Sequence, residues 1–531
     1  MKRLTDIKPF DNELPSKFAD RLGIHYTETV TTAHKKTNGQ FFTPTGIADL
    51  MSSMCDFETH DIRILDPGCG TAILTCSLIE HLVEHNSKLN SIDLVTYETD
   101  VDLIAFSQHS LQYLKKWLKQ RAIHFTHVLH IHDFVLDNAD ALTDTHKKYS
   151  KRIEPFDVII CNPPYFKLSK DDKRTIAAKL LVSGQPNIYS FFMGVATKLL
   201  KENGQLIFIT PRSFTSGSYF KSFREFFFNE VQLQQIHLFI SRKDTFNRDK
   251  VLQETVIIKA TKGSQKNPQV TISTSHGLKD IVNPTIKYFA HNDLIDLTSK
   301  EKILHFPTND SEEAIHNIFK SWTATLKKYD INVSTGPVVS FRSWDFIKNT
   351  YQNGTVFLAP LFWLHNVTKM KLTYPIPRPN KGQYITIEEK SKSILIPNKN
   401  YVLLRRFSSK DDKSRLIAAP YFCNYVEANF IGVENKLNYI YRKNGNLERS
   451  EVVGLCALLN SQLFDSYFRI FNGNVNVSAT ELREITLPPL ETIKEIGNQI
   501  ILSNNFSAEH VNEVVNDYFE TASILHDYDE N

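Results

Sequence analysis

The sequence lacks paired cysteines, long apolar runs and a signal peptide, and each absence excludes a class of protein. Its six cysteines stand singly at positions 55, 69, 76, 161, 423 and 456, which argues against structural zinc and suits a reducing compartment. The longest apolar stretch, at 452–459, is far shorter than the ~20 residues that span a bilayer. The first residues contain no apolar core of a signal peptide. We therefore expect a cytoplasmic protein with no membrane partner and no metal.

Charge is distributed unevenly along the 531 residues. The formal net charge is only +3, but the last 23 residues, from Glu509 onward, contain seven acidic side chains and no Lys or Arg. The rest of the chain is therefore mildly basic, which permits a polyanionic partner without requiring one. The acidic end is typical of a solvated tail or helix face.

Strand and helix patterns alternate between about Ile62 and Ala260. Helical patterns at 71–85 and 101–120 separate short runs rich in β-branched and aromatic residues. Such alternation predicts a largely parallel sheet with helices on both faces. We expect a doubly wound, Rossmann-like α/β domain whose seven strands lie at 63–66, 92–98, 127–134, 156–162, 204–210, 233–240 and 254–260.

The composition changes after about Lys262, where Pro, Asn, Lys and Ser become common. Short strands at 384–389, 393–397 and 401–407 and a helix at 451–471 predict a second, mixed α/β domain. We expect a domain boundary within 261–300. The predicted divisions are a helical lead-in over 1–38, the doubly wound domain over 39–262 and the second domain over 300–531.

Glycine is scarce, with 19 in the chain, yet two lie in one loop between the first predicted strand and its helix (LDPGCGTAILT, 65–75). Gly68 and Gly70 allow a sharp turn and a close approach of ligand to backbone, although many βα turns share this pattern. The loop lacks the Lys-Ser/Thr pair of a triphosphate-binding P-loop. Asp66, which ends the strand, would repel pyrophosphate and attract a cation such as the α-ammonium group of an amino acid.

Two further strands also end near an acid. Glu98 ends the second strand, where a carboxylate can accept hydrogen bonds from both ribose hydroxyls. Asp133 could accept from an exocyclic amino group, and the ring of Phe134 could lie against a purine. Each residue alone could be an ordinary surface or turn residue, but together they describe a site for a nucleoside that carries an ammonium group.

The fourth strand ends in Asn162-Pro163-Pro164-Tyr165. The two prolines remove two N–H donors and stiffen the turn, which leaves the Pro163 carbonyl free to accept beside the Asn162 amide oxygen. An aromatic ring follows at once. Two acceptors beside a ring suit a flat ligand that bears an NH2 group.

These motifs resemble those of methyltransferases that transfer a methyl group from S-adenosylmethionine to an amino group. The upstream stretch GQFFTPTGIADLM (39–51) is similar to the segment before the glycine loop in gamma-class N6-adenine DNA methyltransferases of type II restriction–modification systems. The resemblance is close over about 35–260 and looser over 300–490. It implies a site-specific, adenine-specific DNA methyltransferase that protects host DNA, with a catalytic domain followed by a target-recognition domain.

The resemblance also implies roles for individual residues. Thr43 and Asp66 would hold the methionine end of the cofactor, Gly68 and Gly70 would shape the loop, and Glu98 would bind the ribose. Asp133 and Phe134 would bind the cofactor's adenine. Asn162 and the Pro163 carbonyl would accept from the N6 amino group of a flipped-out adenine, with Tyr165 stacking on that base through its ring face and Phe246 supplying a second aromatic contact.

The expected partner is double-stranded DNA, bound by a monomer that acts separately from any cognate restriction endonuclease. Clusters of basic residues in the second half could contact phosphates, although such clusters are often solvated faces. They are Arg405, Arg406, Lys410, Lys413 and Arg415, and Lys369, Lys371, Arg378 and Lys381. Two alternatives remain open: an RNA or protein-glutamine methyltransferase, and a DNA-recognition subunit of a defence complex.

Overall fold

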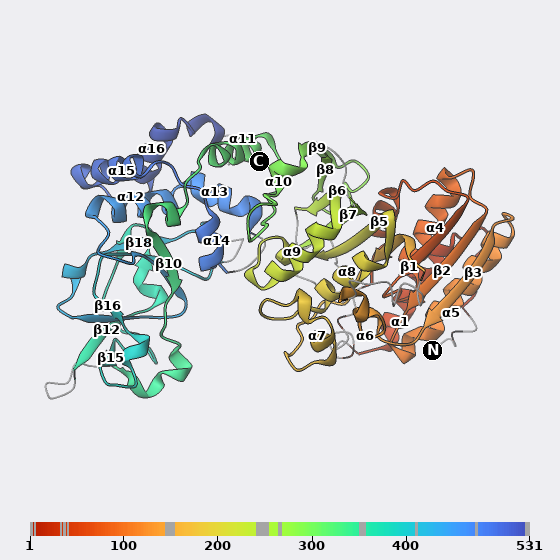
Figure 1. Cartoon of the computed structure of the whole chain (residues 1–531), viewed down its shortest axis with the longest axis horizontal. Helices are drawn as coiled ribbons and strands as arrows, with labels where there is room; N and C mark the ends of the chain where they lie inside the picture. The colour runs from red at the N-terminus through yellow and green to blue at the C-terminus, as the bar shows by residue number, and fades with distance from the viewer. Residues whose placement is uncertain are drawn as a thin grey trace. The chain divides into compact units, whose positions relative to one another are not determined.

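The computed structural model describes residues 4, 7–31, 34, 39, 42–143, 154–240, 254–263, 268–349, 357–408, 413–472 and 476–525. The chain forms two compact units, Met1–His305 and Phe306–Asn531 (Figure 1). Phe246 and Lys410 lie outside the described residues. In the described part of the chain, no helix is both long enough and apolar enough to cross a bilayer.

A central sheet in the order β3-β2-β1-β4-β5-β7-β6-β8-β9 forms the core of the first unit. Strands β3, β2, β1, β4 and β5 are parallel, whereas β7 runs antiparallel to both of its neighbours. The predicted doubly wound, mostly parallel α/β fold is confirmed. The strands are β1 (Asp61–Asp66), β2 (Ser91–Tyr97), β3 (His124–His130), β4 (Phe156–Cys161), β5 (Leu200–Pro211), β6 (Val231–Phe239), β7 (Thr255–Lys262), β8 (Gln269–Ser275) and β9 (Thr285–Ala290).

The prediction of seven strands was wrong, because the described residues place nine strands in the sheet. Strand β8 pairs parallel to β6, and β9 pairs antiparallel to β8 at the edge of the sheet. Strand β8 alternates buried Val270 and Ile272 with polar residues, whereas Phe289 is the one buried residue of β9. Neither segment has the continuous apolar run of a central strand, and backbone pairing adds both to the edge of the sheet.

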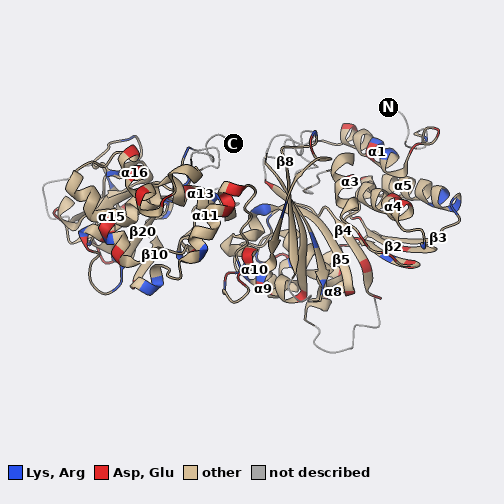
Figure 2. Cartoon of the chain, turned by 90° about the horizontal axis from the view of Figure 1, so that it is seen from above, with Lys and Arg blue, Asp and Glu red and all other residues tan. Residues whose placement is uncertain are grey.

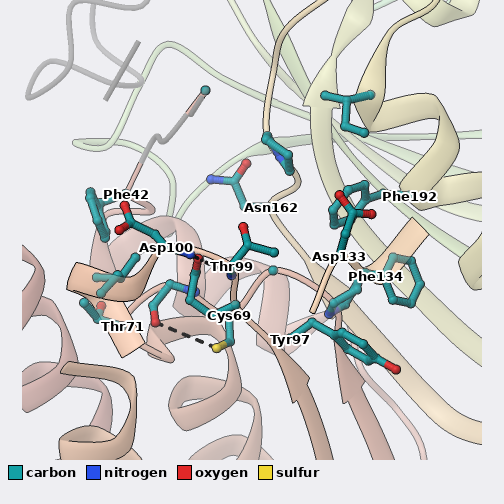
Figure 3. A pocket seen from close by; sticks show the side chains of 18 of the residues that line it. Phe42, Cys69, Thr71, Tyr97, Thr99, Asp100, Asp133, Phe134, Asn162 and Phe192 are labelled. Carbon is teal, nitrogen blue, oxygen red and sulfur yellow. Dashed lines mark hydrogen bonds between the residues drawn. The ribbon is translucent and has the colours of Figure 1, made fainter. Parts of the chain in front are cut away.

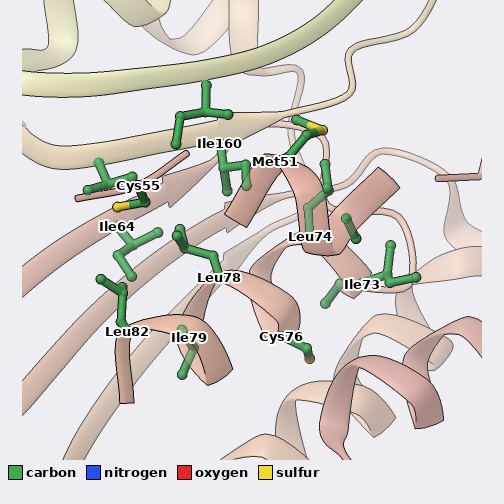
Figure 4. Packing of buried hydrophobic residues seen from close by; sticks show 14 of the residues in the cluster. Met51, Cys55, Ile64, Ile73, Leu74, Cys76, Leu78, Ile79, Leu82 and Ile160 are labelled. Atoms are coloured by element: carbon green, nitrogen blue, oxygen red, sulfur yellow. The ribbon is translucent and has the colours of Figure 1, made fainter. Parts of the chain in front are cut away.

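Helices cover both faces of this sheet. Helices α3 (Thr45–Ser53), α4 (Ile73–His85) and α5 (Val101–Lys119) share one apolar cluster with residues of β1, β2, β4 and β5. Figure 4 shows the part of this cluster where α3 and α4 meet Ile64 of β1 and Ile160 of β4. Helix α8 (Ile188–Leu199) packs against β5 and contacts α6 (Phe134–Asn138) and α9 (Lys221–Glu230). Among the described residues, this unit also contains helices α1 (Pro15–Thr29), α7 (Lys173–Ala177) and α10 (His291–Leu294).

The carboxyl ends of β1 to β4 lie along one edge of the sheet. Asp66 at the end of β1 pairs with Thr96 of β2, and Tyr97 pairs with His130 of β3. Strand β3 ends at His130 and not at Phe134 as predicted, because the Asp133 side chain accepts from the Leu136 amide and begins helix α6. Asp133 therefore belongs to a helix cap.

The second unit contains a four-stranded sheet, β10-β20-β17-β18, and a five-stranded sheet, β11-β15-β12-β19-β16. Its strands are β10 (Ile331–Thr335), β11 (Ile347–Lys348), β12 (Leu358–Phe362), β13 (Val367–Thr368), β14 (Lys371–Leu372), β15 (Tyr384–Thr386), β16 (Ile396–Pro397), β17 (Tyr401–Arg405), β18 (Ala418–Tyr421), β19 (Phe430–Val433) and β20 (Leu437–Arg442). Its helices are α11 (Asp310–Ser321), α12 (Arg449–Asn460), α13 (Gln462–Phe471), α14 (Ala479–Glu484), α15 (Leu490–Ser503) and α16 (Ala508–Phe519).

The single helix predicted at 451–471 is instead two helices. Ser461 adopts an extended backbone conformation between α12 and α13, and its hydroxyl accepts from the Phe464 amide. A serine in this position begins a new helix because it satisfies a free N–H group. The apolar residues continue on both sides of Ser461, which conceals the break in the sequence.

Replacing Leu78 tests the packing of α4 against the sheet. The side chain is fully buried in the cluster that joins α4 to the sheet. Leu78→Ala should lower the free energy of unfolding of the first unit by about 2–5 kcal/mol, through lost burial and a residual cavity. Leu180→Ala, at an exposed position, should change it by no more than about 0.5 kcal/mol. Equal urea midpoints for the two variants would contradict this account of the core.

Candidate functional site

A cavity of about 580 Å³ opens at the carboxyl edge of the first unit's sheet. Its wall includes the loop after β1, the residues after β2, the start of α6 and the loop after β4. Figure 3 shows Phe42 and Asp100 at one end, Asp133 and Phe134 at the other, and Asn162 between them. Eight predicted site residues line the cavity: Thr43, Gly68, Gly70, Glu98, Asp133, Phe134, Asn162 and Pro164.

Asp66 lies beneath the glycine loop and is not part of the cavity wall. Its fully buried carboxylate accepts a 2.7 Å hydrogen bond from the Thr75 hydroxyl and a 3.4 Å hydrogen bond from the Gly68 amide. Burial raises the pKa of Asp66 to about 7, although both hydrogen bonds act in the opposite direction. Its contacts therefore fix the loop from inside, and the structure places no open ligand position beside this carboxylate.

Glu98 closes the glycine loop against the end of β2. One carboxylate oxygen accepts from the Thr99 and Asp100 amides at 2.8 Å each, and the other accepts from the Gly70 amide at 3.1 Å. Gly70 has a φ of +53°, a left-handed conformation that favours glycine. Burial raises the pKa of Glu98 despite these donors. Its carboxylate thus reaches the cavity with a fixed orientation.

Asp133 and Phe134 form the far end of the cavity. The Phe134 ring meets Tyr97 edge-on at 5.3 Å and packs at 5.2 Å from Phe192 of α8. One carboxylate oxygen of Asp133 accepts a hydrogen bond from the Leu136 amide, and the other lies 3.7 Å from the Arg174 guanidinium. Arg174 also lines the cavity, and no sequence motif indicated it because it lies eleven residues past Pro163 on a separate helix.

Asn162 projects from the end of β4 with its carboxamide held at both ends. Its Nδ2 donates to the Thr43 hydroxyl at 3.0 Å, and its Oδ1 accepts from the Tyr165 hydroxyl at 2.6 Å. Thr43 comes from the segment before α3, so the predicted upstream motif and the Asn-Pro-Pro-Tyr motif meet in space. The two contacts define which way the amide faces.

Tyr165 is buried, and it is absent from the cavity wall. Its hydroxyl also lies 2.9 Å from the Ile209 carbonyl of β5, and its ring meets Tyr189 edge-on at 6.3 Å. The phenol therefore has a contact to Asn162 that the sequence did not indicate. Stacking on a target base stays a prediction, and it requires the ring to leave the position seen here.

A cluster of polar side chains lies at the end of the cavity away from Asp133, and no pattern in the sequence predicted it. Asp100 accepts from the Tyr26 hydroxyl at 2.7 Å, lies 2.7 Å from His34 Nε2 and caps α5 through the Asp102 amide. Ligand atoms of His34, Asp100 and Asp102 lie within 4.8 Å of one another. The hydrogen bonds explain this grouping without an ion. They tie the N-terminal segment, where no motif was recognised, to the cavity.

The basic clusters predicted in the second unit separate into buried and exposed residues. Arg415 is buried, and its guanidinium donates to the Ser408 carbonyl and to Asn472. Arg405 donates to the Val367 carbonyl, and Lys381 pairs with the buried Glu434. Arg415 therefore cannot serve as the predicted phosphate contact. Figure 2 marks the positions of Lys and Arg and of Asp and Glu along the ribbon, and both kinds occur in each of the two units.

A parallel sheet with a ligand cavity at its carboxyl edge and an Asn-Pro-Pro-Tyr loop on the rim is typical of amino-group methyltransferases. The profile of the Eco57I restriction-modification methylase family matches residues 74–246. The type II methyltransferase M.PstI of Providencia stuartii is 31% identical over 481 residues, which cover 90% of this chain and 92% of that protein. M.BsuBI of Bacillus subtilis is 33% identical over 475 residues, which cover 88% of this chain and 91% of that protein.

The chain belongs to the family of type II methyltransferases of restriction–modification systems. DNA methylation is the activity of this family, and S-adenosylmethionine is its methyl donor, in agreement with the cofactor predicted from the sequence. Among solved structures, the ATP-dependent Type ISP restriction-modification enzyme LlaBIII bound to DNA aligns over 92% of this chain and 40% of that chain. The sequence identity is 13% and the TM-score is 0.46.

The raised pKa of Asp66 predicts a pH-dependent cost to stability. In an unfolded chain the group ionises near pH 3.9, so between about pH 4 and 7 folding takes up a proton. The contribution of Asp66 to the free energy of unfolding therefore falls as pH rises through this window, by up to about 1.4 kcal/mol per pH unit.

Asp66→Asn should remove this dependence. The difference in unfolding free energy between Asp66→Asn and the wild type should move in favour of the variant from pH 4 to 7 and stay constant above. Urea denaturation at several pH values measures it. Parallel pH profiles for the two proteins would contradict the burial of a protonated carboxyl group.

Proposed function

We propose that this protein transfers a methyl group from S-adenosylmethionine to the N6 amino group of an adenine flipped out of duplex DNA. The observation that carries the proposal is the Asn162 carboxamide, held between Thr43 and Tyr165 on the wall of the cavity. An exocyclic adenine amine is a poor nucleophile because its lone pair is delocalised into the ring. Fixed acceptors beside it favour the tetrahedral form in which that pair is localised.

The cavity fits the cofactor in size and in donor set. Its volume of about 580 Å³ lies within the range of about 300–1,000 Å³ that small-molecule sites occupy. Glu98 offers a carboxylate to the ribose hydroxyls, Phe134 an aromatic face to the adenine, and Asp133 an acceptor to its amino group. Thr43 and the loop with Gly68 and Gly70 would hold the methionine end, with Asp66 supporting the loop from below.

The acceptors for the target amine come from the loop after β4. Asn162 Oδ1 and the Pro163 carbonyl would each accept one N6–H, and within the described residues no N–H or O–H group donates to that carbonyl. When bound, S-adenosylmethionine supplies a methyl group already activated on a sulfonium. The remaining task of the protein is alignment for in-line displacement, and orientation can lower such barriers strongly.

An adenine inside a duplex cannot reach this loop, so the base must leave the helix at a cost of a few kcal/mol. Stacking on an aromatic side chain contributes about 1–3 kcal/mol per base and offsets part of that cost. Tyr165 would supply this contact after its ring turns out of the interior, with Phe246 as a second aromatic. The second unit would recognise the target sequence, and the protein would act as a cytoplasmic monomer, separately from any cognate endonuclease.

Parallel assays with three kinds of substrate distinguish this proposal from its alternatives. Purified protein is given labelled S-adenosylmethionine with duplex DNA, with RNA or with a host protein extract, and the methylated product is identified by nucleoside mass spectrometry and peptide mapping. N6-methyladenine in DNA at one sequence supports the proposal. Label confined to RNA or to glutamine would replace it, and no transfer despite cofactor binding would favour a recognition subunit.

Replacing Glu98 tests the cofactor assignment. Glu98→Gln keeps the shape of the side chain but removes the charge that accepts from the ribose hydroxyls, so S-adenosylmethionine affinity should fall by about 10–100-fold, as expected for hydrogen bonds to a charged group. Calorimetric titration measures the affinity. The matched control is Glu84→Gln, an exposed position on α4, which should bind like the wild type. Unchanged affinity in Glu98→Gln would remove Glu98 from the site.

Replacing Asn162 tests the acceptor. Asn162→Ala should reduce DNA methylation below detection while S-adenosylmethionine affinity stays within about twofold of the wild type, because the side chain faces the amine and not the sulfonium. Single-turnover methylation and calorimetry measure the two quantities. Methylation by Asn162→Ala at the wild-type rate would refute the mechanism.

Tyr165→Phe separates the ring from the hydroxyl. It keeps the aromatic face but removes the donor to Asn162 Oδ1, a hydrogen bond whose loss costs about 1 kcal/mol. The rate of methyl transfer should therefore fall several-fold without a change in the KM for S-adenosylmethionine. A wild-type rate would show that Thr43 alone orients the carboxamide.

A further inference from the structure

The second unit carries two exposed aromatic side chains on one short connector. Residues 336–346 link β10 of the four-stranded sheet to β11 of the five-stranded sheet. Phe341 is 76% exposed and Trp344 is 54% exposed. Keeping large apolar side chains exposed to water costs free energy in the unbound protein, so an exposed pair on one connector indicates a binding surface.

The connector is held in place on both sides of the aromatic pair. Val338 is fully buried, and it donates to the Val433 carbonyl at 3.0 Å and accepts from the Asn435 amide at 2.9 Å. Phe346 packs beside the apolar cluster of the five-stranded sheet. At Gly336 an added Cβ would lie 2.2 Å from the Glu434 carbonyl oxygen, so the close approach of the two backbones at this position requires glycine. Phe341 and Trp344 therefore project from an ordered scaffold.

Two other segments reach the same place. The 435–436 turn links β19 to β20 beside Val338, and Arg406 donates its backbone amide to the Lys436 carbonyl and its guanidinium to the Asn435 carbonyl. The junction surface, defined as residues 339–345, 405–407 and 435–436, thus lies where the two sheets meet. Phe407, 42% exposed, adds a third aromatic ring.

The charge of the junction surface favours an anionic partner. It holds Arg342, Arg405, Arg406 and Lys436 against one carboxylate, Asp345. The acid next to the turn, Glu434, is buried and pairs with Lys381. Within the described residues, neither Arg342 nor Lys436 has a carboxylate within ion-pair distance, and the Arg342 guanidinium lies 5.4 Å from the Phe341 ring centroid.

We propose that the junction surface reads the duplex DNA target, with Phe341 and Trp344 contacting bases and with Arg342 and Lys436 contacting the flanking phosphates. This inference rests on the proposed function and assigns sequence discrimination to the aromatic pair. Rigid aromatic side chains contact bases at little entropic cost, whereas Arg and Lys contact the phosphates of any sequence. The two groups of residues should therefore fail in different ways.

The test uses the full chain and two fluorescent duplexes, one with the methylation site mapped for the wild type and one with that site scrambled. Phe341→Ala and Trp344→Ala should each weaken binding to the mapped duplex by about tenfold or more and leave binding to the scrambled duplex within twofold. Trp344→Phe, which keeps a ring, should retain most of the discrimination. S-adenosylmethionine affinity, which resides in the first unit, should match the wild type in all variants.

Arg342→Ala and Lys436→Ala should instead weaken binding to both duplexes by the same factor. Each should also reduce the magnitude of the slope of log affinity against log salt concentration by about one. The matched control is Tyr288→Ala on edge strand β9 of the first unit, 63% exposed, which should bind both duplexes like the wild type.

If both aromatic variants prefer the mapped duplex as strongly as the wild type does, this inference is wrong while the proposed function stands. The same holds if they lose equal affinity for the mapped and the scrambled duplex. A wild-type protein that binds S-adenosylmethionine but methylates no DNA sequence would overturn the proposed function and this inference with it. Equal affinity for a single-stranded RNA of the same length would assign the surface to another partner and likewise count against the proposal.

Discussion

Parallel pairing of β3, β2, β1 and β4 is the constraint on which the first unit depends. Because these strands point the same way, the residues that follow them share one edge, and a sharp turn after each strand leaves backbone and side-chain polar groups facing one cavity. The apolar cluster below that edge holds α4 against the sheet and so sets the height of the glycine loop. The glycine loop, Glu98, Asp133 and Asn162 are all positioned from this edge, and Thr43 reaches it from the segment before α3.

Hydrogen bonds that backbone amides donate to buried carboxylates then fix the loops. Glu98 accepts from three amides and joins the glycine loop to the end of β2, while Asp66 secures the same loop from below through Thr75 and Gly68. Both carboxylates are paired with donors, yet burial still raises both pKa values. Orientation at this site is therefore obtained at some cost in stability, which is common where function requires buried polar groups.

The two units carry different kinds of surface, and the proposed division of labour between them rests on that difference. The first unit encloses a polar cavity with fixed acceptors, which suits chemistry on a small group. The second unit exposes rigid aromatic rings beside cations at the junction of two sheets, which suits recognition of an extended anionic partner. A methyltransferase that must act at one site in long DNA needs both, because alignment of one methyl group gives no sequence discrimination.

Local patterns in the sequence determined the order of strands and helices, the glycine loop, the acids at strand ends and the Asn-Pro-Pro-Tyr motif, because periodicity and turn chemistry depend on near neighbours in the chain. Only the tertiary structure decided that Thr43 holds the Asn162 amide, that Tyr165 turns inward, that Asp66 lies under the loop and that Arg415 is buried. It also added β8 and β9 to the sheet and brought the connector with Phe341 and Trp344 beside Arg406 and Lys436. These outcomes depend on which atoms come within hydrogen-bonding or packing distance across long separations in sequence, and no local pattern encodes such distances.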